Sequence, residues 1–536
     1  MNVTLNSKTF EKKIKNNTTV YVAGYCFFNG NLLNRESFLE LFFNVKDFNS
    51  FYNLLIQLDG LYSIIVITNN KVFVAVDPLR SFPIFYLKDE KFNLTDDPYY
   101  FFKVLKKVEY DYAKVEEFIS LSFTQSQSTL FKNIFQLDSG QCLEFNLKEK
   151  ELNTKYYRYH ISNKRDDSSV NEIFKKAFNV SKNVFKRLLQ TTEGKTIVVP
   201  LSGGYDSRYI VAMLKEFKYK NVICFTYGRK DSDEVIISKK VAEKLNYKWI
   251  FIEYSEEIVK EYIQTTQFNE CMFFSSKLSS TPHFQDYIAV KYLKDNNLIP
   301  TDSIFVPGHS GDLLGGSHLR SIVVDYKDKC FSEIEDILQS TYEYWYKYNE
   351  FNNKSNINIS QYKEDIESFY KSLSVIDSNY ITYISDSWNI ANRQSKFIVN
   401  SCQVYRYFNY DFRLPLFDQE MVEFWLSIKP YYRTNHILYN DFLLNHLFNK
   451  YNIAFVKEND HSYLKKKLKK VIGESLYKKI KKYLKNDNNN FNYFIKYMLI
   501  DIGMDEKYLY SHIDNVSSIW YLKKLNKEME SLKNAK

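Results

Sequence analysis

Residues 196–217 read TIVVPLSGGYDSRYIVAMLKEF, and this stretch decides the fold. Its first part, TIVVPL, is a continuous apolar run typical of a buried strand, whereas RYIVAMLKEF has the apolar spacing of a helix. Three more apolar runs follow, separated by helical patterns: VICFTYG (222–228), KWIFIEY (248–254) and SIFVPG (303–308). Strands that alternate with helices predict a parallel sheet joined by right-handed crossovers.

The turn SGGYDS (202–207) between the first strand and its helix predicts a polyphosphate site. Exposed backbone N–H groups and the positive end of a helix dipole favour an anion at such a turn. Gly203 and Gly204 allow the backbone to approach it closely, and Ser202 and Ser207 can add hydroxyl donors. The turn lacks the spacing and the lysine of a Walker loop, which disfavours kinase or γ-phosphate hydrolase chemistry. The alternative interpretation is a tight turn capped by serine and aspartate.

The glycines point to the same region, because the chain has only 14 of them, against roughly 37 at average usage. Half lie in the SGGYDS turn, at the end of CFTYG (224–228) and in VPGHSGDLLGGSH (306–318). The carboxyl ends of parallel strands form a shared ligand crevice, so Tyr227, Gly228 and Gly308 should open onto the cleft of the turn. Asp206 and Asp312 would then flank the phosphates as Mg²⁺ ligands. The alternative for Asp312 is a plain turn residue.

The pattern of predicted strands and helices divides the chain into three parts. Residues 1–160 read as short alternating strands with turn signals, which predicts a β-rich domain, and ISNKRDDSS (161–169) is a polar linker candidate. Residues 170–500 form the α/β part, with everything beyond about 330 reading as helical, and 501–536 form a helical tail.

Composition indicates a folded globular protein, with 45% apolar and 26% charged residues. There is no apolar run of 18 residues and no leader-like segment at the amino terminus, so we expect a cytoplasmic protein. The six cysteines are spread singly, which predicts reduced core residues and no zinc site.

The net charge of +9 is local, because residues 464–485 alone hold ten lysines and one glutamate. Their apolar residues have near-helical spacing, so the segment could be a basic amphipathic helix pair that contacts an anionic membrane or an acidic glycan. The alternative is a solvated face over packed apolar residues. No RNA-binding or helix-turn-helix signature accompanies it, and we expect no nucleic-acid partner.

These motifs resemble the asparagine synthetase family, which belongs to the PP-loop ATP pyrophosphatases. The resemblance rests on SGGYDSR, CFTYG, GHSGDLLGG and DFRLPLFDQEMVEFWLSIKP (411–430), and residues 50–140 also look like the family's glutaminase domain. It implies an α/β plus α+β chain: an Ntn-type, β-rich sandwich domain with a degenerate class II glutamine amidotransferase fold, then a parallel-sheet PP-loop (HUP-like) domain with a helical extension.

The resemblance also implies a chemistry. ATP activates a carboxylate as an acyl-adenylate with release of pyrophosphate, and ammonia or an amine then attacks to form an amide. The residues that would bind ATP or pyrophosphate are Ser202, Gly203, Gly204, Asp206, Ser207, Tyr227, Gly228 and Gly308, with Asp206 and Asp312 holding Mg²⁺.

Two departures from the family pattern carry predictions. Glutamine-hydrolysing members expose a cysteine directly after the initiator methionine, whereas this chain has Asn2, and Cys26 lies in an apolar strand typical of a buried thiol. We therefore expect no glutaminase activity. His309 stands where asparagine synthetases place a glutamate and β-lactam-forming relatives a tyrosine. A histidine can take the proton of an attacking amine near neutral pH; the alternative is a hydrogen-bonded turn histidine.

Three further residues complete the predicted catalytic set. Asp386 and Asp411 are candidates to orient the His309 imidazole, and Lys457 is the nearest match to a family lysine that acts on the adenylate and the tetrahedral intermediate. Leu313 replaces the acidic residue that usually follows the aspartate of this motif in the family, and the spacing to the paired glycines is one residue shorter than in asparagine synthetases. Both differences put aspartate in doubt as the substrate.

The sequence thus predicts an ATP-dependent, AMP-forming carbon–nitrogen ligase that joins a small-molecule carboxylate to ammonia or an amine, with ATP and Mg²⁺. Relatives with a GHSGD motif resemble surface-polysaccharide proteins, which suggests a sugar acid as the carboxylate. The alternatives are a β-lactam or lasso-type cyclase and an inactive nucleotide-binding scaffold; a PP-loop sulfur-transfer enzyme is disfavoured because no paired cysteine motif is present.

Overall fold

A computed structural model describes residues 2–87, 92–158, 166–319, 382, 385–455, 490–504 and 516–534. Lys457 and the lysine-rich segment 464–485 lie outside the described residues, so the predictions made for them stay predictions.

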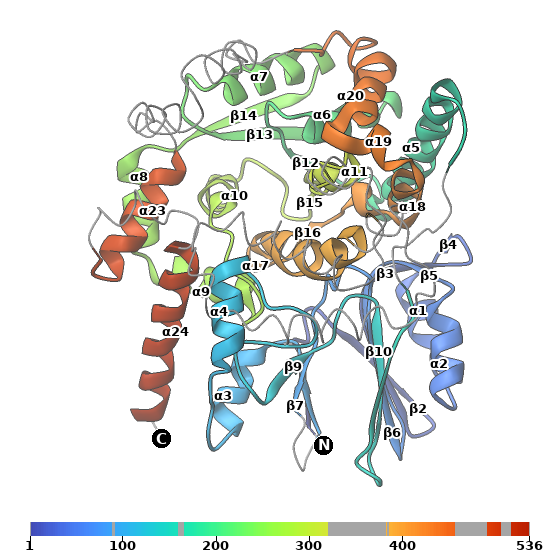
Figure 1. The fold of residues 1–536 in the computed structure, drawn as a ribbon, viewed down its shortest axis with the longest axis vertical. Helices are drawn as coiled ribbons and strands as arrows, with labels where there is room; N and C mark the ends of the chain where they lie inside the picture. Colours follow the sequence, from blue (N-terminus) through green and yellow to red (C-terminus); the bar gives the residue numbers. More distant parts are fainter. Residues whose placement is uncertain are drawn as a thin grey trace, which may run out of the picture.

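The amino-terminal part, residues 2–158, is built on a seven-stranded antiparallel sheet in the order β11-β10-β6-β5-β3-β2, with β4 beside β3 (Figure 1). Its strands are β2 (Glu11–Lys15), β3 (Thr18–Phe28), β4 (Asn31–Leu32), β5 (Leu58–Ile67), β6 (Lys71–Val76), β10 (Gln141–Asn146) and β11 (Leu152–Tyr156). The central strands β5 and β6 are buried on both faces because other layers cover each side of the sheet.

A smaller sheet, in the order β1-β8-β7-β9, faces the larger one. Its strands are β1 (Asn2–Thr4), β7 (Phe85–Leu87), β8 (Asn93–Thr95) and β9 (Ile134–Gln136). Phe92 stacks on Phe145 of β10 at 4.2 Å between ring centroids, so the two sheets share an aromatic core. Helices α1 (Arg35–Glu40) and α2 (Phe48–Leu55) cover the outer face of the larger sheet, and η1 (Pro98–Tyr100), α3 (Phe101–Val104) and α4 (Tyr112–Leu121) complete the domain. The predicted β-rich sandwich is confirmed.

The second part contains a five-stranded parallel sheet in the order β14-β13-β12-β15-β16. Its strands are β12 (Ile197–Pro200), β13 (Val222–Gly228), β14 (Lys248–Glu253), β15 (Ile304–Phe305) and β16 (Asp411–Phe412), and helices α5 (Val170–Thr192), α6 (Tyr205–Glu216) and α7 (Asp233–Leu245) pack around it. The predicted parallel α/β fold is confirmed. The prediction of helix throughout the region beyond 330 is wrong at Asp411–Phe412, because these two residues add the fifth strand beside β15.

The remaining helices surround this sheet and extend toward the sandwich. They are α8 (Glu256–Ile263), α9 (Thr266–Ser276), α10 (Gln285–Asp295), α11 (Gly311–Leu314), η2 (Asn389–Ile398), α16 (Val399–Ser401), α17 (Gln403–Tyr407), η3 (Pro415–Phe417), α18 (Gln419–Ser427), α19 (Pro430–Arg433), η4 (Thr434–His436), α20 (Ile437–Leu443), η5 (Leu444–Phe448), α23 (Asn490–Asp501) and α24 (Val516–Asn534). None of the described helices is long and apolar enough to cross a membrane.

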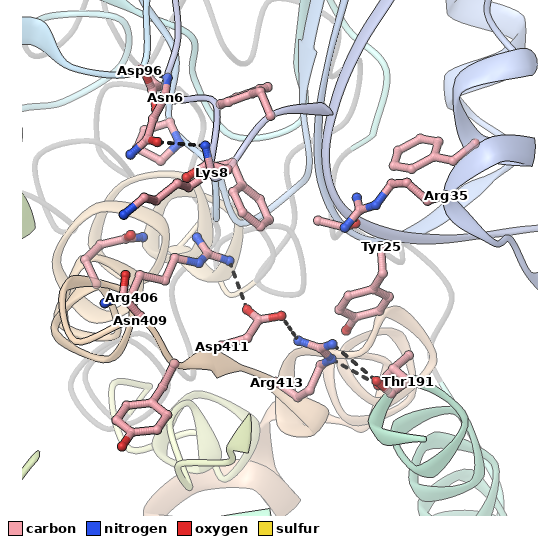
Figure 2. Close-up of a pocket in the computed structure, with 18 of the residues that line it drawn as sticks. Asn6, Lys8, Tyr25, Arg35, Asp96, Thr191, Arg406, Asn409, Asp411 and Arg413 are labelled. Atoms are coloured by element: carbon pink, nitrogen blue, oxygen red, sulfur yellow. Dashed lines mark hydrogen bonds and ion pairs between the residues drawn. The ribbon is translucent and has the colours of Figure 1, made fainter. Parts of the chain in front are cut away.

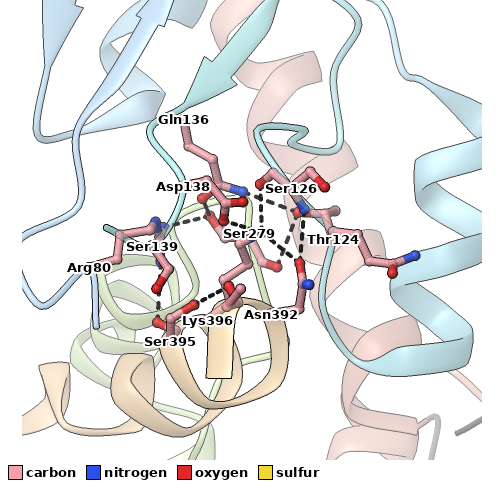
Figure 3. Close-up of polar contacts among 12 residues, drawn as sticks. Arg80, Thr124, Ser126, Gln136, Asp138, Ser139, Ser279, Asn392, Ser395 and Lys396 are labelled. Carbon is pink, nitrogen blue, oxygen red and sulfur yellow. Dashed lines mark hydrogen bonds and ion pairs between the residues drawn. The ribbon is translucent and has the colours of Figure 1, made fainter. Parts of the chain in front are cut away.

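The two parts meet at a buried polar network around the π-helix η2 (Figure 3). Lys396 of η2 has a fully buried side chain whose Nζ lies 3.3 Å from a carboxylate oxygen of Asp138 in the sandwich. The same ammonium donates to the carbonyl of Ser126, while Arg80 donates to Ser279 Oγ at 3.1 Å. Buried charges need partners, so these contacts fix the position of η2 against the sandwich.

The last described helix joins the two parts a second time. In α24, the Tyr521 hydroxyl lies 2.7 Å from that of Tyr99, and Asn526 accepts a hydrogen bond from Tyr110 at 2.8 Å. Figure 1 shows α24 beside α3 and α4, so the carboxyl-terminal helix covers the amino-terminal part.

Candidate active site

The SGGYDS turn joins β12 to α6 as predicted, and its own hydroxyls hold it in shape. Ser202 Oγ accepts a hydrogen bond from the Gly204 amide at 3.1 Å, and the Ser202 amide donates to Ser207 Oγ at 3.0 Å. The buried Arg208 guanidinium donates to the Gly203 carbonyl at 2.9 Å, and its other branch binds the carbonyl of Ile453. Gly204 is the N-cap of α6 and has no side-chain cap, which leaves the amides of the first turn to a ligand.

The GHSGD turn packs directly against this loop, and two glycines make that possible. A Cβ on Gly308 would lie 2.5 Å from the Ser207 amide nitrogen, and a Cβ on Gly311 would lie 1.9 Å from a carboxylate oxygen of Asp206. Ser310 between them has a φ of 82°, a left-handed conformation that is strained for serine. The structure therefore brings the two predicted motifs together at the carboxyl ends of β12 and β15.

Asp206 and Asp312 lie close enough to influence each other. Burial, with the negative charge of Asp312 as the second cause, raises the pKa of Asp206 to about 7, although the Tyr439 hydroxyl donates to it at 3.0 Å and opposes the shift. The Asp312 side chain is 68% exposed. A cation would relieve this unfavourable pair, and two carboxylates fit a Mg²⁺ ion that takes its other ligands from phosphate and water. The described residues contain no group of three or more His, Cys, Asp or Glu side chains that could hold a metal.

Tyr227 and Gly228 end β13 beside the same cleft. The Tyr227 ring stacks on Tyr254 at 4.8 Å, and its hydroxyl donates to Asp286 at 2.5 Å. The Tyr405 hydroxyl donates to the other oxygen of Asp286 at 2.7 Å. Two tyrosine hydroxyls thus fix one carboxylate below the cleft, and they keep the Tyr227 ring in place.

His309 is half-buried at the edge of this group. Its Nε2 lies 3.2 Å from Ser401 Oγ, and burial lowers the pKa of the imidazole, while the charge of Asp286 acts in the opposite direction. His283 is a neighbouring, half-buried histidine whose pKa falls to about 4, because it is desolvated and because His309 is near. The lowered pKa favours the neutral imidazole, the form a general base requires.

The structure places the two aspartates expected to orient His309 in other contacts. Asp386 forms a buried ion pair with Arg433 at 2.6 Å, and Asp411, at the first position of β16, pairs with Arg413 at 2.6 Å and with Arg406 at 3.7 Å. Among the described residues, Ser401 is the hydrogen-bond partner of the His309 ring, and Asp286 is the carboxylate whose charge raises the pKa of His309.

Sequence reasoning missed Asp286, Ser401, Tyr405 and Tyr439. Each is one of several polar residues in its helix (α10, α16, α17 and α20), so no spacing or motif singles it out. The packing of four separate helices against the cleft brings them together.

Asn2 and Cys26, on which the prediction of no glutaminase activity rests, lie in contrasting surroundings. Asn2 is exposed in the edge strand β1, and Cys26 is fully buried in β3, where burial strongly raises the pKa of its thiol. A buried neutral thiol is a poor nucleophile.

Comparisons with known proteins give one family match within this chain. The family model for asparagine synthase matches residues 188–288. A search of curated proteins gives no match.

Several solved structures resemble parts of the chain. The ammonia-dependent NAD synthetase of Campylobacter jejuni is 16% identical, with a TM-score of 0.22, over 43% of this chain and 97% of that one. The glutamine phosphoribosylpyrophosphate amidotransferase of B. subtilis is 11% identical, with a TM-score of 0.17, over 55% and 63%. The glutamine-dependent NAD⁺ synthetase of Acinetobacter baumannii is 12% identical, with a TM-score of 0.19, over 51% and 53%. Scores this low carry no information about substrate.

The matched residues run from the end of α5 into α10, and they include the SGGYDS turn and the Tyr227–Gly228 strand end. The GHSGD turn and residues 411–430 lie beyond the match but pack against it. Residues 188–288 therefore match the asparagine synthase family model, and the matched stretch includes the SGGYDS turn.

Proposed function

We propose that the protein is an ATP-dependent ligase that forms an amide from a carboxylate and ammonia or an amine, with release of AMP and pyrophosphate. The observation that carries this proposal is the contact between the SGGYDS and GHSGD turns, which sets free amides and two carboxylates around one cleft. Such a cleft suits a nucleoside triphosphate with its cation.

The chemistry has two steps. A carboxylate oxygen of the substrate attacks the α-phosphorus of ATP, and pyrophosphate leaves as the acyl-adenylate forms. The amine nitrogen then attacks the acyl carbon, AMP leaves, and the nitrogen loses a proton. Amides of the SGGYDS turn would hold the pyrophosphate, and Mg²⁺, when bound by Asp206 and Asp312, would neutralise phosphate charge.

His309 is our candidate for the group that takes the amine proton. Its pKa is lowered, which favours the neutral form; its ring is held by Ser401, and it stands three residues before Asp312 in the turn that meets the SGGYDS loop. The buried Cys26 and the exposed Asn2 support a ligase that takes ammonia or an amine without its own glutaminase. A sugar acid of a surface polysaccharide is the carboxylate we propose.

The test is release of AMP and pyrophosphate from Mg-ATP by the purified protein, across aspartate, free uronic acids and nucleotide-linked uronic acids. We expect release that depends on one acid and is lost in Asp206→Ala but kept in Asp302→Ala, which removes an exposed carboxylate elsewhere. Release without any acid, or release that survives in Asp206→Ala, would refute adenylation in this cleft.

A further inference from the structure

A cavity of about 810 Å³ lies between the sandwich and the asparagine synthase part (Figure 2). Its walls on the synthase side are Glu193 and Lys195, which precede β12, and Asp411, which begins β16. Because the SGGYDS turn follows the other end of β12, this cavity opens at the opposite edge of the sheet from the nucleotide cleft. Its volume lies within the range of small-molecule sites, about 300–1,000 Å³.

The cavity has a surplus of positive charge. Among the described residues that line it, six are basic and three are acidic. The basic residues are Lys8, Arg35, Lys195, Lys277, Arg406 and Arg413.

The acidic residues are largely committed to other contacts. Figure 2 shows Arg406 and Arg413 on either side of Asp411, with ion-pair distances of 3.7 and 2.6 Å. Asp96 accepts a hydrogen bond from the Asn6 amide at 3.1 Å. The charges of Asp96 and Asp97 act on Lys277, but neither carboxylate forms an ion pair with it within 4.0 Å among the described residues.

Lys277 is the most constrained of the lysines. It is only 7% exposed, and its Nζ donates to the backbone carbonyl of Asp96 at 2.7 Å. No carboxylate among the described residues lies within 4.0 Å of the side chains of Lys277, Lys8 or Lys195. A buried ammonium retains donors that a ligand can satisfy, and its burial is costly until an anion approaches.

Aromatic rings form the rest of the wall. Tyr25, Phe274 and Tyr407 are half-buried in the cavity, and the Arg413 guanidinium lies 4.4 Å from the centre of the Tyr25 ring. Rings beside a cluster of cations suit a molecule with an apolar or planar part and an anionic end.

We propose that this cavity binds a small molecule that carries a carboxylate or phosphate group, at a site separate from the nucleotide cleft. Lys277 forms the base of the site, and Lys8 from the sandwich and Lys195 from the synthase part approach the anion from the two sides. The ligand therefore bridges the two parts of the chain. This site does not depend on the ligase reaction proposed above.

The test is isothermal titration calorimetry of the full chain with citrate in one series and inorganic phosphate in another, at constant ionic strength. We expect binding of at least one probe, weakened about tenfold or more in Lys277→Gln, since a buried charge-assisted hydrogen bond is lost. The double variant Lys8→Gln/Lys195→Gln should weaken the same probe, and it removes only exposed side chains, so it keeps the test valid if Lys277→Gln does not fold.

Two controls locate the binding. Lys175→Gln/Lys186→Gln removes two exposed charges on α5, away from the cavity, and should change nothing. Gly311→Ala, which disturbs the nucleotide cleft, should also bind normally. Citrate-only binding assigns a carboxylate ligand and phosphate-only binding a phosphate ligand. No heat with either probe, or equal weakening in the α5 pair, overturns the proposal.

Discussion

Gly311 lies so close to Asp206 that there is no room for a side chain at this position. An alanine there would bring its Cβ to 1.9 Å from the Asp206 carboxylate, so either the GHSGD turn or Asp206 must move. We expect Gly311→Ala to lose acid-dependent pyrophosphate release while the protein stays folded by circular dichroism.

The matched control is Gly30→Ala. Its Cβ would meet nothing within 4 Å, although its φ of +78° is unfavourable for alanine. It should cost about 1 kcal/mol of stability and leave the activity unchanged. Full activity in Gly311→Ala would show that the contact between the two turns is not needed.

His309 gives a prediction about pH. Burial lowers its pKa below the ordinary 6.5, and a base acts when deprotonated, so amide formation should rise with pH through a value below 6.5 and then stay level. His309→Ala should abolish this limb and slow amide formation by about 10²–10⁴-fold. Pyrophosphate release should persist.

His446→Ala is the control, because the His446 ring packs against the rings of Phe174 and Phe442. It should retain the wild-type pH profile. An unchanged profile in His309→Ala would leave His309 with a structural role.

The strand, turn and helix around SGGYDS could be predicted from sequence because all their parts are local. A strand, a glycine turn and a helix within 22 residues carry their own periodicity, and the structure confirms them at β12 and α6. Asp286 and Ser401 gave no signal, because only the packing of distant helices brings them to His309. Asp411 matched a family motif, yet its neighbours in space, Arg406 and Arg413, fix it in the cavity at the amino edge of the sheet.

At the scale of elements, η2 is the contact between the two parts of the chain. Removing the Asp138 carboxylate would take away negative charge that offsets the buried positive charges of Lys396 and Arg80 (Figure 3). We expect Asp138→Asn to lower the free energy of unfolding by about 3–5 kcal/mol, and Lys396→Met, which deletes a buried cation, to cost less.

Denaturant unfolding at pH 7 measures both, with Asp302→Asn at an exposed position as the control for the change of charge. A larger loss in Lys396→Met than in Asp138→Asn would contradict the buried-cation explanation.

The same lysine predicts a pH dependence of stability. Burial, opposed by Asp138, lowers the pKa of Lys396 to about 8 from the ordinary 10.5. Between these two values the unfolded chain binds more protons at this lysine than the folded chain, so its contribution to stability rises with pH. Below pH 8 Lys396 is charged in both the folded and the unfolded chain, so its contribution to the free energy of unfolding no longer changes with pH.

Wild type and Lys396→Met should therefore differ in the free energy of unfolding by an amount that moves in favour of wild type from pH 8 to pH 10. Chemical denaturation at several pH values measures this difference. A constant difference over that interval would mean that Lys396 keeps its ordinary pKa.

At the scale of the whole molecule, one apolar core runs through both parts. The same cluster contains Leu143 of the sandwich, Ile197 of the parallel sheet and Trp520 of α24. We expect a single calorimetric unfolding transition, with a van't Hoff enthalpy equal to the calorimetric one, since neither part keeps a complete core without the other. Two resolved transitions would show that the parts unfold independently.

The position of α24 has a consequence for synthesis. The ribosome makes Val516–Asn534 after every other described segment, yet this helix covers α3 and α4 near the start of the chain. Tyr99 and Tyr110 must wait for Tyr521 and Asn526, which are made 422 and 416 residues later. The nascent sandwich therefore carries an open apolar flank while the parallel sheet is being made, which makes it a natural client for chaperones that bind during translation.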